Sequence, residues 1–342
     1  MKNQEAYYSY CPIPNATYLA LRSNMLQAGM AEAGYSLRCL QELSMDQWAA
    51  HFTYKSDRLF RNGGYSPPIW ARSRGEKVEL LGVNMIWEKL PVLVRADSDI
   101  VELDQLKGKR LAVSVHPNVI FDVHQFVTRQ GWREALERHE IGADEVHWVE
   151  LKNYDGIARE GRGAKGGQID RSEVEALEQG AVDAIYGKFP RSERMLASGS
   201  FRRLEDVWTA YPVLLTVSSA LAEREPEAVS AYLKQTVKAA RWAVRNRNEA
   251  TVLLAEQTNG TPEEFRRSFS EKTLLNLEPN LTDSSLAAVE RCVRFLYDNR
   301  CIPASVEVGQ WANPYFLEQA RIQAEAELGE IDHVQSVVSG TD

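Results

Sequence analysis

The 342-residue sequence contains no long apolar run and no concentrated tract of positive charge. Because a membrane-spanning helix needs about 20 consecutive apolar residues, no such helix is predicted and no membrane partner is expected. The formal net charge is -8, so nucleic acid is not an expected partner either. The polar and aromatic residues 1–10 lack the apolar core of a secretory signal, and we therefore expect a cytoplasmic protein.

Cysteine and histidine are also scarce and show no metal-binding pattern. The four cysteines form no CxxC pair, and no histidine follows them at zinc-site spacing: Cys11, Cys39, Cys292 and Cys301. Reduced thiols are the expectation for a cytoplasmic chain of this kind. The sequence therefore predicts neither a zinc site nor a disulfide framework.

One glycine pattern resembles a dinucleotide-binding fingerprint but lacks its context. Gly161, Gly163 and Gly166 satisfy the GxGxxG spacing within a loop predicted over residues 152–168. In the true motif the glycines follow a strand directly and open a helix, and neither feature is predicted here. We interpret the segment as a long charged loop of unassigned role.

The length and the alternation of strand-like and helix-like segments predict an α/β protein with two lobes. Apolar runs at Leu90–Arg95 and Val213–Val217 read as two extended crossovers between the lobes. We expect lobe I to comprise residues 1–92 and 213–342, and lobe II residues 93–212. Each lobe is predicted to hold a parallel sheet flanked by helices, with a ligand cleft between the lobes.

A cysteine stands at the first predicted turn of the chain. The aromatic residues before Cys11 favour a strand, which Pro12 and Pro14 end, and Asn15 is placed to cap a helix over residues 16–34. A thiol in a strand-to-helix turn near helix-terminal N–H groups is a candidate nucleophile or proton donor. Taken alone, the same cysteine also fits a small buried apolar residue.

Four further candidates lie between residues 51 and 64. His51 can donate, accept or carry a proton near neutral pH, and Arg61 offers a planar fork of donors for an anion. Gly63 and Gly64 allow unusual backbone angles and close approach of a ligand to main-chain N–H groups. The simpler interpretations are a core or surface histidine, and an arginine that is solvated or forms a structural ion pair.

Two more side chains are candidates for contact with the ligand. His116 follows a predicted strand, and ligand sites of α/β folds lie at the carboxyl ends of strands. Tyr54 is close in sequence to His51 and is expected to flank the site, although packing explains it equally well.

The stretch Asp104-Gln105-Leu106-Lys107-Gly108-Lys109, followed by a strand, resembles a segment of sulfonate-, nitrate- and thiamine-precursor-binding proteins. This resemblance implies the type II periplasmic-binding-protein fold, in which two lobes flank a cleft. It says little about the ligand, because many ligands are bound on one fold.

A narrower resemblance covers nearly the whole chain. The sequence is similar to the 2'-hydroxybiphenyl-2-sulfinate desulfinase family in three motifs: Tyr8-Ser9-x-Cys11-Pro12-x-Pro14-Asn15-Ala16, His51-Phe52-Thr53-Tyr54 and Arg61-x-Gly63-Gly64-x-x-Pro67-Pro68. The resemblance implies that Cys11, His51 and Arg61 are catalytic. It also implies that Arg61 and a backbone N–H of Gly64 bind the sulfinate, and that no cofactor is needed.

Our first hypothesis is therefore a monomeric desulfinase that hydrolyses an aryl sulfinate to the arene and sulfite. The sequence leaves two routes open, since Cys11 can attack the sulfur atom or protonate the ring carbon. The second hypothesis is a non-catalytic binding protein for a sulfonate-like anion. The organic part of the ligand is not specified by these motifs.

Overall fold

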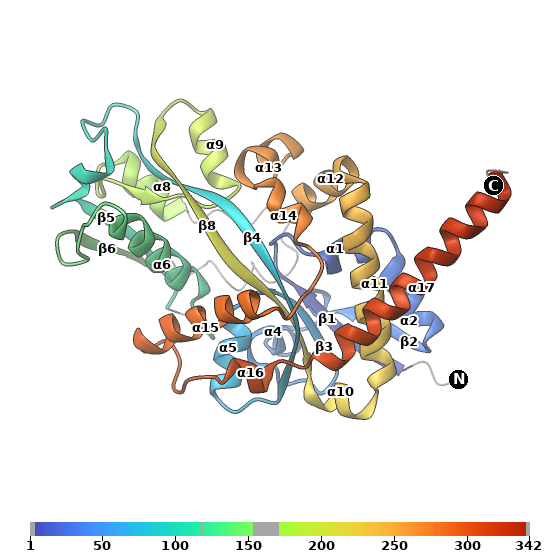
Figure 1. Cartoon of the computed structure of the whole chain (residues 1–342). Helices are drawn as coiled ribbons and strands as arrows, with labels where there is room; N and C mark the ends of the chain where they lie inside the picture. Colours follow the sequence, from blue (N-terminus) through green and yellow to red (C-terminus); the bar gives the residue numbers. More distant parts are fainter. Residues whose placement is uncertain (1–3, 118, 153–170, 340–342) are drawn as a thin grey trace. The chain divides into compact units, whose positions relative to one another are not determined.

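The computed structural model describes residues 4–117, 119–152 and 171–339 (Figure 1). The GxGxxG string and residues 153–168 of the predicted loop lie outside these ranges. The chain divides into two compact units, each described by itself below. Unit 1 comprises residues 1–85, 212–254 and 274–342, and unit 2 comprises residues 86–211 and 255–273.

Two strands of 18 residues, β4 (Val78–Arg95) and β8 (Phe201–Ser218), carry the chain from one unit to the other. The two runs expected to be crossovers, Leu90–Arg95 and Val213–Val217, lie in these strands, each of which is much longer than expected. The hydrogen-bonded strand order is β2-β1-β3-β8-β4-β7, and β5 and β6 form a separate pair.

Unit 1 begins as a βαβ arrangement. Its first elements are β1 (Gln4–Tyr10), α1 (Ala16–Arg22), α2 (Met25–Glu32), β2 (Tyr35–Cys39), a 3₁₀ turn (Leu40–Glu42), α3 (Met45–Trp48), α4 (Ala50–Thr53), β3 (Leu59–Gly64) and α5 (Ser66–Ser73). Strand β1 pairs in parallel with β2 on one side and with β3 on the other. The single helix expected over residues 16–34 is wrong, because Asn24 adopts left-handed backbone angles and separates α1 from α2.

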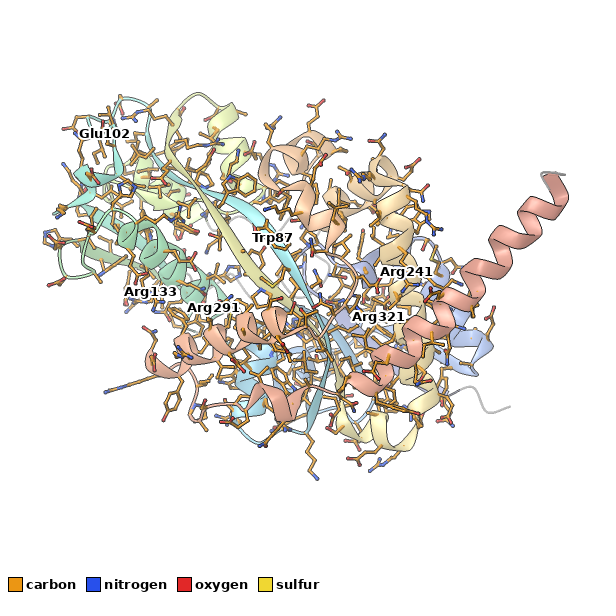
Figure 2. All side chains as sticks on the ribbon, viewed as in Figure 1. Trp87, Glu102, Arg133, Arg241, Arg291 and Arg321 are labelled. Atoms are coloured by element: carbon orange, nitrogen blue, oxygen red, sulfur yellow. The ribbon has the colours of Figure 1, made fainter. Side chains whose placement is uncertain are left out.

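The later part of unit 1 is helical. After β8 come α10 (Ser219–Arg224), α11 (Pro226–Arg245), α12 (Arg247–Gln257), α14 (Glu271–Leu275), α15 (Asp283–Asp298), α16 (Val308–Trp311) and α17 (Pro314–Ser339). The end of α12 and the start of α14 belong to unit 2. Helix α11 packs against α1, α2 and α17. Arg241 of α11 and Arg321 of α17 both reach Glu278, at 3.0 and 2.9 Å, and so tie these helices together (Figure 2).

Unit 2 is built around a second parallel pair of strands. Its elements are a 3₁₀ turn (Leu103–Leu106), β5 (Arg110–Val115), α6 (Val123–Glu137), β6 (His147–Lys152), α8 (Arg171–Glu178), β7 (Ile185–Tyr186), α9 (Arg191–Ala197) and α13 (Pro262–Ser268). Leu111 and Val113 of β5 pack in one apolar cluster with Trp132 of α6, whereas Ala112 packs in another with Leu177 of α8. Alternate residues of β5 are therefore buried under helices on both faces.

Two sequence expectations differ from this architecture. The sheets are not purely parallel, because β8 runs antiparallel to β3 and β7 antiparallel to β4. Strand β4 leads the chain from unit 1 to unit 2, and β8 leads it back. This reversal of direction produces a mixed sheet. The chain passes from one unit to the other within β4, between residues 85 and 86, and within β8, between residues 211 and 212. The predicted boundaries between the lobes were 92/93 and 212/213.

The segment 255–273 belongs to unit 2, although the predicted lobe I contained it. Its helix α13 starts with a capping box formed by Thr261 and Glu264. Phe265 and Phe269 then contact the ring of Phe189, and Arg267 pairs with Glu193 at 2.7 Å. These contacts with unit 2 are long-range in sequence, so local patterns did not reveal them.

Candidate active site

Strand β1 and the turn after it place Cys11 next to β3. The Cys11 N–H donates to the Asn62 carbonyl at 3.1 Å, and the Cys11 carbonyl accepts from the Ile13 N–H at 2.8 Å. Gln41 holds the preceding Tyr10 carbonyl at 2.7 Å. Asn15 caps α1 as predicted, accepting from the Tyr18 N–H at 3.0 Å. The backbone around the thiol is therefore held on both sides, and the thiol itself is partly exposed.

The structure brings Cys11, His51 and Arg61 together, all within unit 1. Arg61 Nη2 lies 3.3 Å from Cys11 Sγ and 3.4 Å from His51 Nε2. Cys11 Sγ and His51 Nε2 are 3.6 Å apart. Three polar atoms thus form a compact triangle, although 50 residues of sequence separate its first and last members.

Arg61 is the most unusual member, because it lies in the middle of β3 and is fully buried. Its Nη1 donates to the Gly64 carbonyl at 3.0 Å. Across the described ranges no carboxylate pairs with its guanidinium, and its Nε finds no hydrogen-bond partner there. Since a buried charge without a counter-ion is costly, the site is suited to receive an anion.

His51 is uncharged in this environment. Burial is the main cause, and the Arg61 charge adds to it, so the pKa of His51 lies well below its ordinary value. Arg61 Nη2 can only donate, and a favourable contact therefore requires the lone pair of His51 on Nε2 and its proton on Nδ1. That Nδ1 is buried and has no hydrogen-bond partner among the described residues.

The two glycines are placed differently from the expectation. Gly63 and Gly64 lie in extended strand β3, opposite Leu214 and Val213 of β8, so neither supplies the unusual backbone angles that the sequence suggested. A Cβ at position 63 would lie 2.4 Å from Cys11 Sγ. Gly63 therefore provides space for the thiol, and Gly64 supplies the carbonyl that holds Arg61.

Tyr54 is a buried neighbour of the triangle and ends α4 in left-handed backbone angles. Its hydroxyl lies 2.6 Å from Thr216 Oγ1, and Thr216 donates to the Arg61 carbonyl at 3.2 Å. The Tyr54 hydroxyl is therefore the donor to Thr216. Burial raises the pKa of Tyr54, so its side chain supports β3 in its neutral form.

His116 lies in unit 2, directly after β5 as expected, and is buried. Its Nδ1 is 3.1 Å from Asp122 Oδ1, and the backbone N–H of His116 donates to Asp122 Oδ2 at 2.6 Å. The ring of His124 lies 5.1 Å from its own ring. A contact of His116 with a ligand stays a prediction.

Sequence reasoning missed two residues of the site, Trp48 and Thr216. The Trp48 ring stacks on the His51 ring, with 4.4 Å between ring centroids. The spacing of three residues between them was an available signal, because such residues share a helical face. Thr216 has no signal of this kind, since only the pairing of β8 with β3 places it opposite Arg61.

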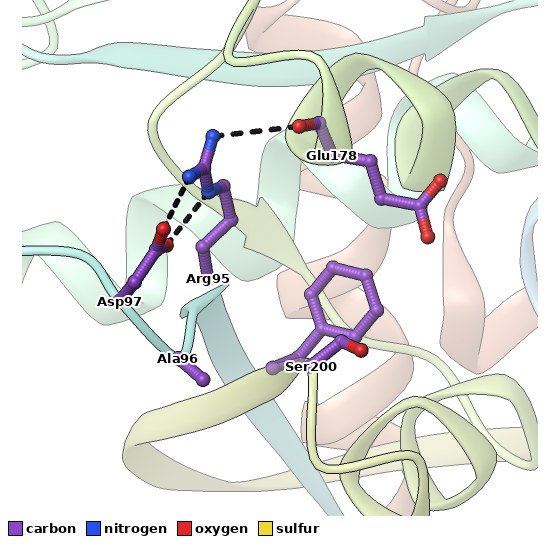
Figure 3. Close-up of a pocket in the computed structure, with 6 residues that line it drawn as sticks. Arg95, Ala96, Asp97, Glu178 and Ser200 are labelled. Atoms are coloured by element: carbon purple, nitrogen blue, oxygen red, sulfur yellow. Dashed lines mark hydrogen bonds and ion pairs between the residues drawn. The ribbon is translucent and has the colours of Figure 1, made fainter.

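A pocket in unit 2 offers a useful contrast (Figure 3). It encloses about 370 Å³ and is lined by Arg95, Ala96, Asp97, Glu178, Ser200 and Phe201. Its arginine is neutralised, because Arg95 Nε donates to Asp97 Oδ1 at 2.8 Å. This pocket therefore lacks the unpaired cation that distinguishes Arg61.

In the parts of the chain that the structure describes, no cluster of three or more His, Cys, Asp or Glu side chains is arranged to hold a metal ion. No helix in those parts is long and apolar enough to cross a membrane.

Comparisons with known proteins point to sulfur chemistry. No family model matches the chain. The sequence is 29% identical to 2'-hydroxybiphenyl-2-sulfinate desulfinase of Rhodococcus erythropolis and of Rhodococcus qingshengii, over 92% of this chain and 92% of each relative. A solved structure of the desulfurization enzyme DszB matches with a TM-score of 0.76 and 26% identity, covering 94% of this chain and 99% of that one.

A cysteine-to-serine variant of DszB in complex with biphenyl-2-sulfinic acid matches with a TM-score of 0.77 and 27% identity, over 94% of this chain and all of that one. The aliphatic sulphonate-binding protein SsuA of Escherichia coli matches with a TM-score of 0.62 and 17% identity, over 91% and 92% of the two chains. The chain therefore has the α/β fold shared by DszB and periplasmic binding proteins, and it is similar in sequence to desulfinases.

Proposed function

We propose that this protein is a desulfinase that hydrolyses an aromatic sulfinate, resembling 2'-hydroxybiphenyl-2-sulfinate, to the arene and sulfite without a cofactor. The observation that carries the proposal is the buried Arg61, which has no acidic partner among the described residues and contacts the Cys11 thiol at 3.3 Å. The similarity to desulfinases over 92% of the chain supports it.

The charges favour one of the two chemical routes. Arg61 is the single cation of the triangle, because His51 is neutral. When a sulfinate binds, its negative charge compensates Arg61, and a thiolate at Cys11 would then be a second, uncompensated anion. A protonated thiol, with S–H directed at His51 Nε2, is the form that suits this site. We therefore assign Cys11 the role of proton donor.

In the proposed step, Cys11 S–H transfers its proton to the ring carbon that carries the sulfinate, and the carbon–sulfur bond breaks with its electron pair returning to the ring. Sulfur dioxide leaves without charge. The negative charge has then moved to Cys11 Sγ, which Arg61 Nη2 still contacts at 3.3 Å. Arg61 faces one negative charge before and after the transfer, so it stabilises both states.

Water then adds to sulfur dioxide, giving bisulfite and a proton that restores the Cys11 thiol. The sum is aryl sulfinate plus water to arene plus bisulfite, which balances in atoms and charge. His51 orients the thiol as a neutral acceptor, and Gly64 and Tyr54 support Arg61 from within the protein. Contact of substrate with the Gly64 N–H and with His116 is part of the proposal.

The test is a sulfite-release assay over a panel of aryl and alkyl sulfinates, with Cys11→Ser alongside. We expect release from an aryl sulfinate and a loss of at least about 10²-fold in Cys11→Ser. Near-normal turnover by Cys11→Ser would exclude Cys11 from the chemistry. Tight binding of an aryl sulfonate without any sulfite release would identify a binding protein instead.

The route has its own test. Mass spectrometry of the enzyme quenched during turnover should detect no sulfur-containing adduct on Cys11. A peptide carrying such an adduct would replace the proton-donor route with attack of the thiolate on sulfur.

We also propose that the enzyme is a cytoplasmic monomer. All four cysteines lie in the described part of the chain and are thiols rather than disulfides, the usual state in a reducing compartment. Light scattering of the purified chain and fractionation of the source cells would test these two points.

A further inference from the structure

The His51 ring is held in an unusual way for a histidine in an active site. Such rings are ordinarily oriented by a carboxylate or carbonyl that accepts from Nδ1–H. Here His51 Nδ1 is buried without a hydrogen-bond partner among the described residues. What contacts the ring is aromatic: Trp48 stacks on it with centroids 4.4 Å apart and planes 22° apart, and the Phe52 ring meets it nearly edge-on at 4.8 Å.

We propose that Trp48 is a positioning residue that sets the orientation and the protonation state of His51 in place of a carboxylate. The inference rests on the proposed desulfinase function and extends it to a residue that does not touch substrate. Trp48 is itself 5% exposed and also contacts the Phe52 ring at 5.9 Å, so its indole is fixed in place.

The stack acts by geometry and by exclusion of water. An indole face against the imidazole limits rotation of the His51 ring, which keeps Nε2 directed at Cys11 Sγ and Arg61 Nη2. The same face removes water from one side of the ring and so disfavours the charged imidazolium. A carboxylate on Nδ1 would have the opposite effect, because it would stabilise a positive charge beside Arg61.

Few groups among the described residues face His51. Arg61 from β3 and Cys11 from the turn after β1 face Nε2, and Tyr54 at the end of α4 lies beside Arg61. Helix α3 brings the Trp48 ring, and its acidic residue Asp46 is exposed. Loss of the indole would therefore expose His51 to water without exposing it to a new charged group.

The experiment compares two variants. Trp48→Leu removes the aromatic ring that stacks on His51, whereas Trp48→Phe keeps a smaller aromatic ring. Trp208→Leu is the matched control, because Trp208 is 48% exposed and belongs to unit 2. Histidine-selective NMR of the full-length chain reports the pKa of His51, assigned with His51→Gln, and sulfite release is followed from pH 5.5 to 8.

In the wild type, the His51 ring protons should resonate upfield through the indole ring current and should not titrate in this range. In Trp48→Leu the upfield shift should disappear and the pKa of His51 should move up towards that of an exposed histidine, about 6.5. The kcat of the Trp48→Leu variant should then fall by about three- to tenfold between pH 8 and pH 5.5. Trp48→Phe should restore most of the wild-type profile, and Trp208→Leu should retain it.

Three results would overturn the proposal. The first is an unshifted His51 resonance in the wild type, which needs no variant to fold. The second is a folded Trp48→Leu protein with an unchanged His51 titration. The third is a Trp48→Phe protein that behaves like Trp48→Leu. If no sulfinate is turned over by the wild type while the NMR results hold, the proposed function fails but the role of Trp48 in positioning His51 stands.

Discussion

Gly63 leaves open the space that the Cys11 thiol occupies: a Cβ at position 63 would lie 2.4 Å from Cys11 Sγ and 2.8 Å from its Cβ. Real Cβ atoms do not approach so closely, and the nearer atom is the reacting one. The neighbouring Gly64 is different, since a Cβ there would meet only Ile13 Cδ1 at 3.5 Å, an ordinary contact.

We therefore expect Gly63→Ala to displace the thiol and reduce kcat about 10²-fold, because a misplacement of about 1 Å can have that effect. Gly64→Ala is the matched comparison, with the same change of residue in the same strand; it keeps the backbone N–H and carbonyl of position 64 and adds only an ordinary contact, so it should lose much less activity than Gly63→Ala. Sulfite release measures both. Equal activities for the two variants would show that the close approach at position 63 does not position the thiol.

Arg61 should contribute more to binding than to folding. It is fully buried and lacks an acidic partner in the described part of the chain, so removing its charge removes a desolvation penalty. We expect Arg61→Met to be no less stable than wild type without ligand, yet at least about 10²-fold less active. Thermal unfolding with and without an aryl sulfinate measures this.

The stabilisation of the folded protein by a bound sulfinate tests the role of Arg61 in binding directly. At 100 times its Kd, a ligand stabilises the folded state by about 2.7 kcal/mol. Wild type should show a rise in Tm with the sulfinate, and Arg61→Met should show none. An equal rise in both proteins would remove Arg61 from the binding site.

Glu88 makes stability depend on pH. It is buried in unit 2 and accepts from the Tyr211 hydroxyl at 2.6 Å. Burial raises the pKa of Glu88 to about 7, above the value of about 4.3 in an unfolded chain. Its protonated form therefore favours folding, and this contribution is complete below about pH 4.3 and declines as pH rises through about 7.

The matching variant is Glu88→Gln, which keeps an acceptor for Tyr211 but cannot ionise. We expect its free energy of unfolding to exceed that of wild type at pH 8 by more than it does at pH 5. Urea unfolding at both pH values gives the comparison. A difference that does not change with pH would mean that Glu88 does not titrate in this interval.

Local sequence patterns predicted many of the elements correctly. Strand β1 ends at Tyr10 because Pro12 and Pro14 follow, and Asn15 caps α1 with its side chain. The apolar run at Leu90–Arg95 was predicted as a short extended crossover, although it is the end of the 18-residue strand β4. In the part of β4 that precedes Leu90, alternate residues such as Ile86 and Glu88 are buried, and such burial depends on tertiary packing.

By itself, the sequence determined the residue types of the site, since Cys11, His51 and Arg61 stand in motifs that resemble those of desulfinases. Only the tertiary structure decided that their polar atoms meet within 3.3–3.6 Å and that Arg61 is buried without an acidic partner in the described ranges. It also decided that His51 stacks on Trp48 and is neutral. The physical reason is that charge state depends on desolvation and on neighbours brought together by strand pairing, which no local pattern encodes.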